Sequence, residues 1–336
     1  MKHFLISRTD NIGDVVLSLP LIHFIKKNFP DAKLSFLGKG LVSCLVHAYG
    51  GVDEFVSYEE LQGLASEDKR VRYIKNLKID TVIHAYPRRE LARLFWLAGV
   101  ACRVGTSRRF YHWYYCNRRP DVSRKKSVLH ESQLNLKLLE GLGLRADPSL
   151  NNLKSILKIK PSQKEKFRHL MHQKKFNLVV HPGSRGSSRH WDLQQFIDFI
   201  NALDPKRFKV FITGDGGEKK SFRDPILSRC SYVVDAFDLF SLKDFINFLS
   251  LADGFVSGST GPLHLAAGLG VNSLGLYPLD TSLGPRRWGP VGQNAEALCP
   301  VGVCRGCRFF GKCTCMTLLK KESVLEKVQQ WSGHEF

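Results

Sequence analysis

Four loops in the second half of the chain contain the residue types that bind an anionic ligand. Each follows a short apolar run typical of a strand, and each is rich in glycine, hydroxyl or cationic side chains. The loops are His181 to Trp191, Gly214 to Glu218, Ser257 to His264, and Leu283 to Pro290. The third leads into a Leu- and Ala-rich run that favours helix, and backbone N–H groups at a helix N-terminus attract phosphate. One such loop alone is ordinary turn chemistry, but four together predict a nucleotide-diphosphate site.

The side chains of these loops suit the parts of such a ligand. Arg185 or Arg189 can pair with a diphosphate, and the hydroxyls and amides beside them can donate to it. Glu218 can accept hydrogen bonds from ribose hydroxyls, and Arg286 with Arg287 adds two cations. The chain has no GxxxxGKS or GxxxxGKT loop, which argues against a P-loop NTPase. Its first strand–helix turn also lacks GxGxxG, which argues against a dehydrogenase.

In the first half, Asp14 stands just past Gly13 and after the first apolar run. At the carboxyl end of a parallel strand its carboxylate would face a ligand, where it could take a proton from an attacking hydroxyl. The alternative is that Asp10, Asn11 or Asp14 caps the following helix, which is a common role for these residue types. Position in the sequence does not decide between the two.

The composition is that of a globular protein with a strong positive charge. The chain has 336 residues, is 43% hydrophobic and carries a formal net charge of +19. These values exclude a disordered chain and imply an acidic partner. The densest segment is 86–126, with eleven Lys and Arg against Glu90 and Asp121, and with five aromatics between residues 110 and 115. This mixture suits nucleic-acid bases, a lipid headgroup layer, or solvent with no partner.

Nine cysteines are present, five of them in the tail at positions 299, 304, 307, 313 and 315. The spacing Cys304-x-x-Cys307 with Cys313 or Cys315 is compatible with metal ligands, but no regular second pair follows. The alternative is reduced thiols in a structural loop, and we expect no metal and no required cofactor. The sequence shows neither an apolar run of transmembrane length nor a signal peptide, so we expect a cytoplasmic protein.

The apolar pattern predicts two halves of alternating strands and helices. In the first half we expect strands at 3–7, 34–37 and 81–85, and helices up to about residue 28 and at 134–142. A Lys-rich stretch at 147–175 contains the linker. In the second half we expect strands at 177–180, 209–213, 232–234, 254–256 and 273–277, and helices at 192–203, 218–229, 241–251 and 261–268. Such alternation implies parallel sheets covered on both faces, with ligands at the carboxyl ends of the strands.

These segments together resemble glycosyltransferase family 9, whose best-known members are the ADP-heptose:lipopolysaccharide heptosyltransferases. The resemblance covers nearly the whole chain. Its motifs are Arg8-x-x-Asn-Ile-Gly-Asp-Val-Val-x-x-x-Pro20, His181-Pro-Gly-Ser184, Arg189-His-Trp191, Gly214 to Glu218, Ser259-Thr-Gly-Pro-Leu-His-Leu-Ala-Ala267, Arg287-Trp-Gly-Pro290, and Cys315-Met316 with Val324.

The resemblance implies an α/β fold of the GT-B-like class, with two Rossmann-like, doubly wound parallel-sheet domains facing a cleft. Residues 1–160 would form an N-terminal acceptor-binding domain. Residues 161–316 would form a C-terminal domain that binds the nucleotide sugar, and a helix within 317–336 would pack back on the N-terminal domain. The resemblance also implies an inverting transfer that needs no metal.

The resemblance assigns roles to individual residues. It makes Asp14 the general base and places Arg189, where the family usually has Lys, on the donor diphosphate as the second catalytic residue. The expected donor-binding residues are Ser184, Arg185, Ser187, Ser188, Glu218, Ser259, Thr260, Gly261, His264 and Arg287. With the basic segment facing the acceptor, the expected acceptor-binding residues are Arg8, Arg88, Arg108, Arg109 and Tyr111.

We therefore expect an inverting glycosyltransferase that moves heptose from ADP-heptose onto the lipopolysaccharide or lipooligosaccharide core. A lipid-linked anionic acceptor would place the protein at the inner face of the cytoplasmic membrane, without a nucleic-acid partner. Ser259 stands where the family often has Asp, which leaves the donor sugar open. The alternatives are a transferase that uses another nucleotide sugar, a catalytically silent family member, a sugar-nucleotide epimerase and a nucleic-acid-binding protein.

Overall fold

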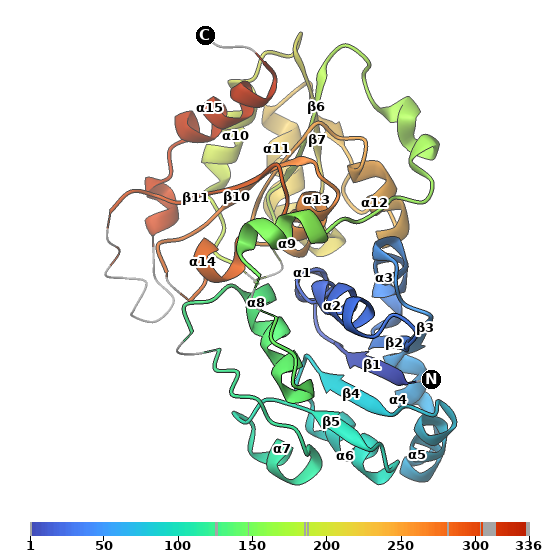
Figure 1. The fold of residues 1–336 in the computed structure, drawn as a ribbon. Helices are drawn as coiled ribbons and strands as arrows, with labels where there is room; N and C mark the ends of the chain where they lie inside the picture. Colours follow the sequence, from blue (N-terminus) through green and yellow to red (C-terminus); the bar gives the residue numbers. More distant parts are fainter. Residues whose placement is uncertain are drawn as a thin grey trace. The chain divides into compact units, whose positions relative to one another are not determined.

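Two parallel sheets organise the chain, one in each half (Figure 1). The structure is a computed structural model that describes residues 2–124, 127–146, 148–184, 186, 188–280, 282–302, 304 and 314–333. The chain divides into two units, residues 1–159 and 160–336. This division falls one residue before the boundary expected from the sequence.

The first unit contains a five-stranded sheet in the order β3-β2-β1-β4-β5. Its strands are β1 (His3–Ser7), β2 (Lys33–Gly38), β3 (Glu54–Ser57), β4 (Thr81–His84) and β5 (Cys102–Val104). All pairings are parallel. Every residue of β1 and β4 is buried, as expected for central strands that helices cover on both faces. The strand order reverses between β1 and β4, and loops at such a point form binding sites in open α/β sheets.

Short helices connect the strands of this unit. They are α1 (Ile12–Val16), α2 (Pro20–Asn28), η1 (Gly40–Val42), α3 (Ser43–Tyr49), α4 (Tyr58–Gly63), α5 (Glu67–Asn76), α6 (Arg89–Leu97), α7 (Phe110–Tyr115), α8 (Glu131–Leu136), η2 (Lys137–Leu142) and α9 (Leu150–Ile156). Pro20 occupies the first turn of α2, where its missing N–H costs nothing. Gly143 ends η2 in the left-handed conformation with φ of 75°.

The second unit contains a six-stranded sheet in the order β11-β10-β9-β6-β7-β8. Its strands are β6 (Phe176–His181), β7 (Phe208–Ile212), β8 (Val234–Asp235), β9 (Gly254–Gly258), β10 (Asn272–Leu276) and β11 (Ala295–Leu298). All pairings are again parallel. The order reverses between β6 and β9, so the loops after these two strands occupy the position where a doubly wound sheet binds its ligand.

The helical elements of the second unit follow the same alternation. They are η3 (Lys164–Leu170), α10 (Leu193–Asn201), η4 (Gly216–Glu218), η5 (Lys219–Arg223), α11 (Asp224–Arg229), α12 (Leu242–Leu249), α13 (Gly261–Gly268), α14 (Pro285–Trp288), η7 (Cys315–Leu318) and α15 (Lys321–Trp331). The predicted α/β class with doubly wound parallel sheets is confirmed. The prediction omitted β3, β5 and β11, which are short or partly exposed edge strands with a weak apolar signal.

The C-terminal helix α15 packs on α10, within the second unit. Its buried residues Val324 and Val328 belong to the same apolar core as Phe196 and Phe199 of α10. Trp191 strengthens this attachment, because its indole nitrogen donates to the carbonyl of Leu319 at 2.8 Å. This helix was predicted to pack on the N-terminal domain, whereas its apolar side is buried in the core of the second unit.

Candidate active site

A buried cation, Arg8, organises the loop that follows β1. Its Nη2 donates to Oδ1 of Asp14 at 2.7 Å, and its Nε lies 2.8 Å from Oδ1 of Asp10. Its Nη1 donates to the carbonyl of Ala85, just past β4, at 2.9 Å. Arg8 therefore ties the ends of the two central strands together and holds both carboxylates. Because it is buried among these partners, its contacts are those of a residue that positions Asp14.

A second arginine completes a polar network around this loop. Nε of Arg124 donates to Glu131 at 2.8 Å, and its Nη2 donates to Asn135 at 3.1 Å. Arg8 donates to the same oxygen of Asn135 at 3.2 Å, while the amide of Asn135 donates to the carbonyl of Leu17. Glu131 and Asn135 lie one turn apart on α8, so a single helix face closes the network.

The network changes the proton affinity of its carboxyl groups. Burial raises the pKa of Asp14 above its ordinary value, and the negative charge of Glu131 adds to this, while Arg8 opposes it. Burial and the charge of Asp14 raise the pKa of Asp10 to about 6, again against the pull of Arg8. A carboxylate with a raised pKa is a stronger base than an exposed one, which is what proton removal from a hydroxyl requires.

Asp14 is positioned within a helix and does not cap it. It lies in the first turn of α1, and the capping residue Asn11 makes no hydrogen bond through its side chain. The carboxylate of Asp14 instead accepts from Arg8, with 21% of the side chain exposed, against 12% for Asp10. Of the two, Asp14 is therefore the more accessible to a substrate.

The expected acceptor-binding residues lie in two places. Arg88, which precedes α6, donates to the hydroxyl of Thr9 at 2.6 Å, next to Arg8, and its guanidinium lies over the rings of Tyr58 and Tyr86. The remaining acceptor-binding residues, Arg108, Arg109 and Tyr111, lie at the β5 edge of the sheet, on α7 or just before it. There, Arg108 makes a two-pronged pair with Asp121, Arg109 is exposed, and Tyr111 is half-buried.

In the second unit, Glu218 brings two of the predicted loops together. Its carboxylate accepts from the backbone N–H of Ser184 at 2.8 Å. It also lies so close to Gly183 that a Cβ atom there would stand 2.1 Å from a carboxylate oxygen. The loops after β6 and β7 therefore meet at this carboxylate, and glycine is required at position 183 for that approach.

The loop after β9 is built around hydroxyl groups. Ser257 and Thr260 share a hydrogen bond of 2.7 Å, and Thr260 caps α13 by accepting from the N–H of Leu263. Tyr277 lies beside Ser259 and donates through its hydroxyl to the carbonyl of Trp288 at 2.5 Å, while burial raises the pKa of Tyr277 well above its usual range. Ser259 therefore lies beside a buried ring at the end of β10.

The loop after β6 lies against this hydroxyl loop. A Cβ atom at Gly258 would stand 3.1 Å from the hydroxyl of Ser188. Gly261 begins α13, and His264, one turn further on, is buried. The structure thus brings Ser188, Ser259, Thr260, Gly261 and His264 to the ends of the neighbouring strands β6 and β9.

Two cations of the predicted loops, Arg189 and Arg287, have contacts within the second unit. Although burial opposes the change, hydrogen bonds from Ser282 and the nearby charge of Arg189 lower the pKa of Asp280. Arg287 lies on α14 with its guanidinium over the ring of Trp288. The predicted ligands Arg185 and Ser187 lie outside the described residues.

The sequence is similar to proteins named as glycosyltransferases. The model of "Glycosyltransferase family 9 (heptosyltransferase)" matches residues 69–308, which is well over half of the chain. The chain belongs to glycosyltransferase family 9. A Haemophilus influenzae protein named "Putative glycosyltransferase" is 26% identical over 312 residues, which cover 89% of this chain and 90% of that protein.

Solved structures of other family 9 enzymes share the fold. A family 9 glycosyltransferase from Veillonella parvula superimposes with a TM-score of 0.81 at 16% identity, over 99% of this chain and 98% of that one. The E. coli ADP-heptose lipopolysaccharide heptosyltransferase II gives a TM-score of 0.77 at 15% identity, with the same coverage. The predicted family and the GT-B-like fold class are confirmed.

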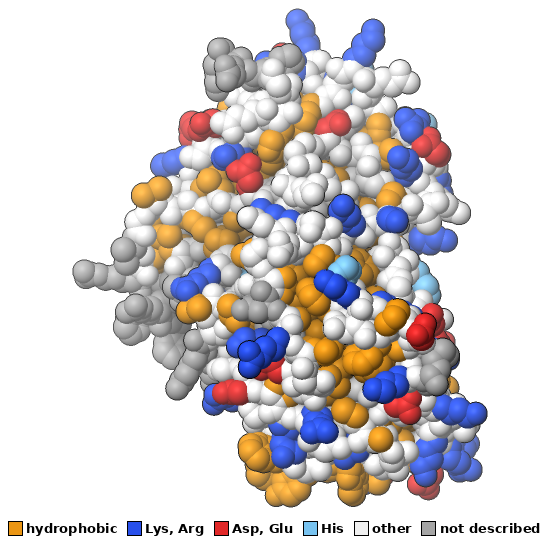
Figure 2. Space-filling view, viewed as in Figure 1, with side chains coloured by type: hydrophobic (Ala, Val, Ile, Leu, Met, Phe, Trp, Pro, Cys, Tyr) orange, Lys and Arg blue, Asp and Glu red, His pale blue; other side chains and the backbone are white. Residues whose placement is uncertain are grey.

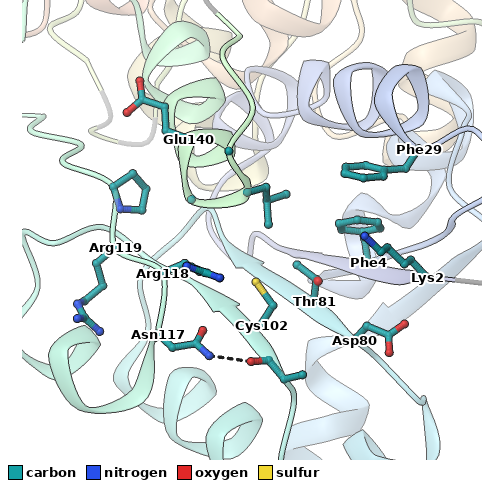
Figure 3. Close-up of a pocket in the computed structure, with 15 residues that line it drawn as sticks. Lys2, Phe4, Phe29, Asp80, Thr81, Cys102, Asn117, Arg118, Arg119 and Glu140 are labelled. Carbon is teal, nitrogen blue, oxygen red and sulfur yellow. Dashed lines mark hydrogen bonds between the residues drawn. The ribbon is translucent and has the colours of Figure 1, made fainter.

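A cavity on the first unit of this glycosyltransferase lies at the edge of the sheet opposite to the Arg8 loop (Figure 3). Its lining includes Lys2, Thr81 and Cys102, at the amino ends of β1, β4 and β5. The residues expected to bind substrates follow the carboxyl ends of the strands instead. The cavity contains none of them, so its size alone does not mark it as the active site.

The described residues contain neither a metal-binding cluster nor a membrane-spanning helix. Within them, no group of three or more His, Cys, Asp and Glu side chains is placed to hold a metal ion; Cys307 and Cys313 lie outside that part. No helix in the described part of the chain is long and apolar enough to cross a membrane.

Several residues of the first-unit network were not predicted from the sequence. Glu131 and Asn135 are polar residues four apart on a helix that is otherwise largely buried, and this spacing could have indicated them. Arg124 was counted only as part of a basic segment. Asp10 was considered as a helix cap but not as a partner of Arg8.

Proposed function

We propose that this family 9 glycosyltransferase is an inverting enzyme that transfers heptose from ADP-heptose to the core of lipopolysaccharide or lipooligosaccharide. The observation that carries the proposal is the Arg8–Asp14 pair: a partly accessible carboxylate with a raised pKa at the carboxyl end of the central strand β1. The name of the E. coli structural neighbour supports the donor and acceptor classes.

In this mechanism Asp14 removes the proton of the acceptor hydroxyl as that oxygen attacks the anomeric carbon. Arg8 holds the carboxylate in one orientation through its 2.7 Å hydrogen bond. The bond from the anomeric carbon to the diphosphate oxygen breaks as the new glycosidic bond forms, which inverts the configuration. General-base assistance of this kind contributes about 10²–10⁴ in rate.

The second unit would hold the donor. The departing diphosphate gains negative charge, which Arg189 and the N-terminus of α13 would stabilise with Thr260 and Gly261, without a metal ion. Glu218 would accept hydrogen bonds from the ribose. Ser184, Ser188, His264 and Arg287 complete the donor-binding set, and Arg185 and Ser187 belong to it from the sequence alone.

The charge of the first unit suits an anionic, lipid-linked acceptor. Arg88, Arg109 and Tyr111 present cations and an aromatic ring from that unit, and Arg108 is already paired with Asp121. Such an acceptor places the enzyme at the inner face of the cytoplasmic membrane. An anionic surface attracts each nearby Lys or Arg by about 1 kcal/mol.

Ser259 supports a second candidate, a family member that uses another nucleotide sugar or has lost turnover. A serine donates and accepts hydrogen bonds but brings no charge to the donor sugar. Turnover of the variant Ser259→Asp with a series of nucleotide sugars distinguishes a transferase that uses another sugar from a protein without turnover. A transferase specific for another sugar changes its donor preference, whereas a silent protein stays inactive with every donor.

The first test is a thermal-shift series with ADP, UDP, GDP, CDP and NAD. A ligand at 100 times its Kd stabilises the protein by about 2.7 kcal/mol, which shifts Tm by several degrees. We expect selective stabilisation by ADP that Glu218→Gln reduces and Asp14→Asn leaves unchanged. Selectivity for another diphosphate would change the donor and keep the transferase, while no shift with any ligand would contradict the donor site.

The second test is turnover of ADP-heptose with a heptose-lacking lipopolysaccharide core. Release of ADP together with a product of the opposite anomeric configuration supports the proposal. An epimerase would change the sugar without releasing ADP, and a nucleic-acid-binding protein would bind oligonucleotides more tightly than ADP. Donor binding without ADP release would identify the silent alternative.

A further inference from the structure

Helix α7 carries an exposed aromatic stripe on the first unit. Phe110, Trp113 and Tyr114 are 77%, 59% and 66% exposed, although rings of this size are usually buried. Their spacing of three and four residues places them on one side of the helix. His112, on the opposite side, is buried. In Figure 2 hydrophobic side chains gather at the end of this unit where Figure 1 shows α6 and α7.

The stripe continues onto the neighbouring helix. Trp96 of α6 is 46% exposed, and its ring lies 5.7 Å from that of Tyr115 on α7. The two helices pack together, so Trp96, Phe110, Trp113 and Tyr114 belong to one surface, here called the aromatic patch. An apolar surface made of several large rings differs from the single exposed side chains that are normal in proteins.

The segment that carries most of the aromatic patch contains arginines and no acids. Residues 103–119 contain five arginines and no Asp or Glu. Arg109 and Arg118 are exposed, and the guanidinium of Arg119 lies 4.8 Å from the centroid of Trp113. Within the described part of the chain, Arg108 of this segment pairs with an acid from outside it, Asp121. The partner of this surface must therefore be both apolar and anionic.

The ring geometry favours a bilayer over nucleic acid. Bases stack on open ring faces, but Arg119 covers one face of Trp113, and the rings of Phe110 and Tyr114 meet edge to face at 73°. Trp, Tyr and Phe flanked by arginines are instead the side chains that enter the boundary between headgroups and acyl chains.

We infer that the aromatic patch inserts into an anionic lipid surface, with Arg109 and Arg118 on the headgroups. The inference rests on the proposed function, because a lipid-linked acceptor is the reason for the enzyme to bind a membrane. Net charge alone would not predict its second part, which is that some of the binding is apolar and persists at high salt. Charge attraction alone weakens strongly as salt rises.

The test is co-sedimentation of the full chain with phosphatidylcholine vesicles, with and without phosphatidylglycerol, over a salt series. The variant Phe110→Ser/Trp113→Ser should lower the partition coefficient by about tenfold or more and remove the salt-resistant part. Arg109→Gln/Arg118→Gln should lower binding to anionic vesicles about fivefold per arginine and leave the salt-resistant part intact. Leu41→Ser is the matched control, because Leu41 is 60% exposed on η1 of the same unit.

The outcomes separate the two claims. If the aromatic double variant binds vesicles as the wild type does, or if oligonucleotides compete the protein off them, the inference is wrong. Turnover of the Phe110→Ser/Trp113→Ser variant with a deacylated, soluble acceptor is measured in parallel, because this turnover does not need the aromatic patch. Unchanged soluble turnover with lost vesicle binding supports docking, whereas vesicle binding without any turnover contradicts only the proposed function.

Discussion

Replacement of Asp14 by asparagine tests the catalytic role of the first-unit network most directly. The amide has nearly the same shape but carries no charge and does not accept a proton at neutral pH. If Asp14 is the general base, kcat should fall by about 10²–10⁴, equivalent to roughly 3–5 kcal/mol of transition-state stabilisation. The KM for the donor should change little, because the donor-binding candidates lie in the second unit.

The matched control is Asp10→Asn. Asp10 and Asp14 both contact Arg8, at 2.8 and 2.7 Å, so either substitution removes one carboxylate from the same buried cation. Because the other carboxylate remains in each variant, we expect both to lose a similar stability of roughly 1–3 kcal/mol. Chemical denaturation measures this loss, and single-turnover release of ADP measures the chemical step.

The pH profile provides an independent check. A base must be ionised, so kcat/KM should decline as the pH falls through the raised pKa of Asp14, above the range of an ordinary carboxyl group. Asp14→Asn should retain only a low rate that no longer follows this limb. Wild-type turnover in Asp14→Asn, or equal losses in both asparagine variants, would refute the reasoning, since equal losses indicate a purely structural network.

Three further predictions concern other parts of the chain. Gly183→Ala should displace the carboxylate of Glu218 and weaken ADP binding by about tenfold or more in calorimetry, whereas Gly63→Ala, which meets open space, should not. Burial lowers the pKa of His84 to about 3 in the folded chain. Because the unfolded chain protonates this histidine at a higher pH than the folded chain does, the free energy of unfolding should fall as the pH drops below about 6.5. His84→Leu should flatten this decline in denaturation curves. Trp191→Phe should lose the hydrogen bond to Leu319 and lower the unfolding free energy by about 1–2 kcal/mol.

The sequence alone indicated the strands whose residues are buried on both sides. Strand β1 was predicted with its observed bounds, and β6, β7 and β9 to within two residues. Central parallel strands are continuous apolar runs, and this signal is local. Pro20 and Gly143 likewise marked the start of α2 and the end of η2. Proline restricts the backbone angle φ and glycine widens its allowed range, and both effects are local to the residue.

The side-chain chemistry of the loops was also visible in the sequence. The pattern placed Asp14, Glu218 and the 257–264 segment after strands, and the structure brings the last two to the same edge of one sheet, after β7 and β9, which flank β6. Their partners were not visible, because Arg8–Asn135 and Glu218–Ser184 are contacts between segments 127 and 34 residues apart. Such pairs follow from strand order, which a single sequence does not state.

What the sequence by itself determined is therefore the alternation of buried strands and helices, the excess of positive charge and the residue types of each loop. Only the tertiary structure decided that Arg8 is buried against Asp14, that α15 packs on α10, and that the rings of α7 stay exposed. The physical reason is that periodicity and turn chemistry act between near neighbours in the chain. Burial, ion pairing and the pKa of a carboxylate depend on elements that only folding brings together.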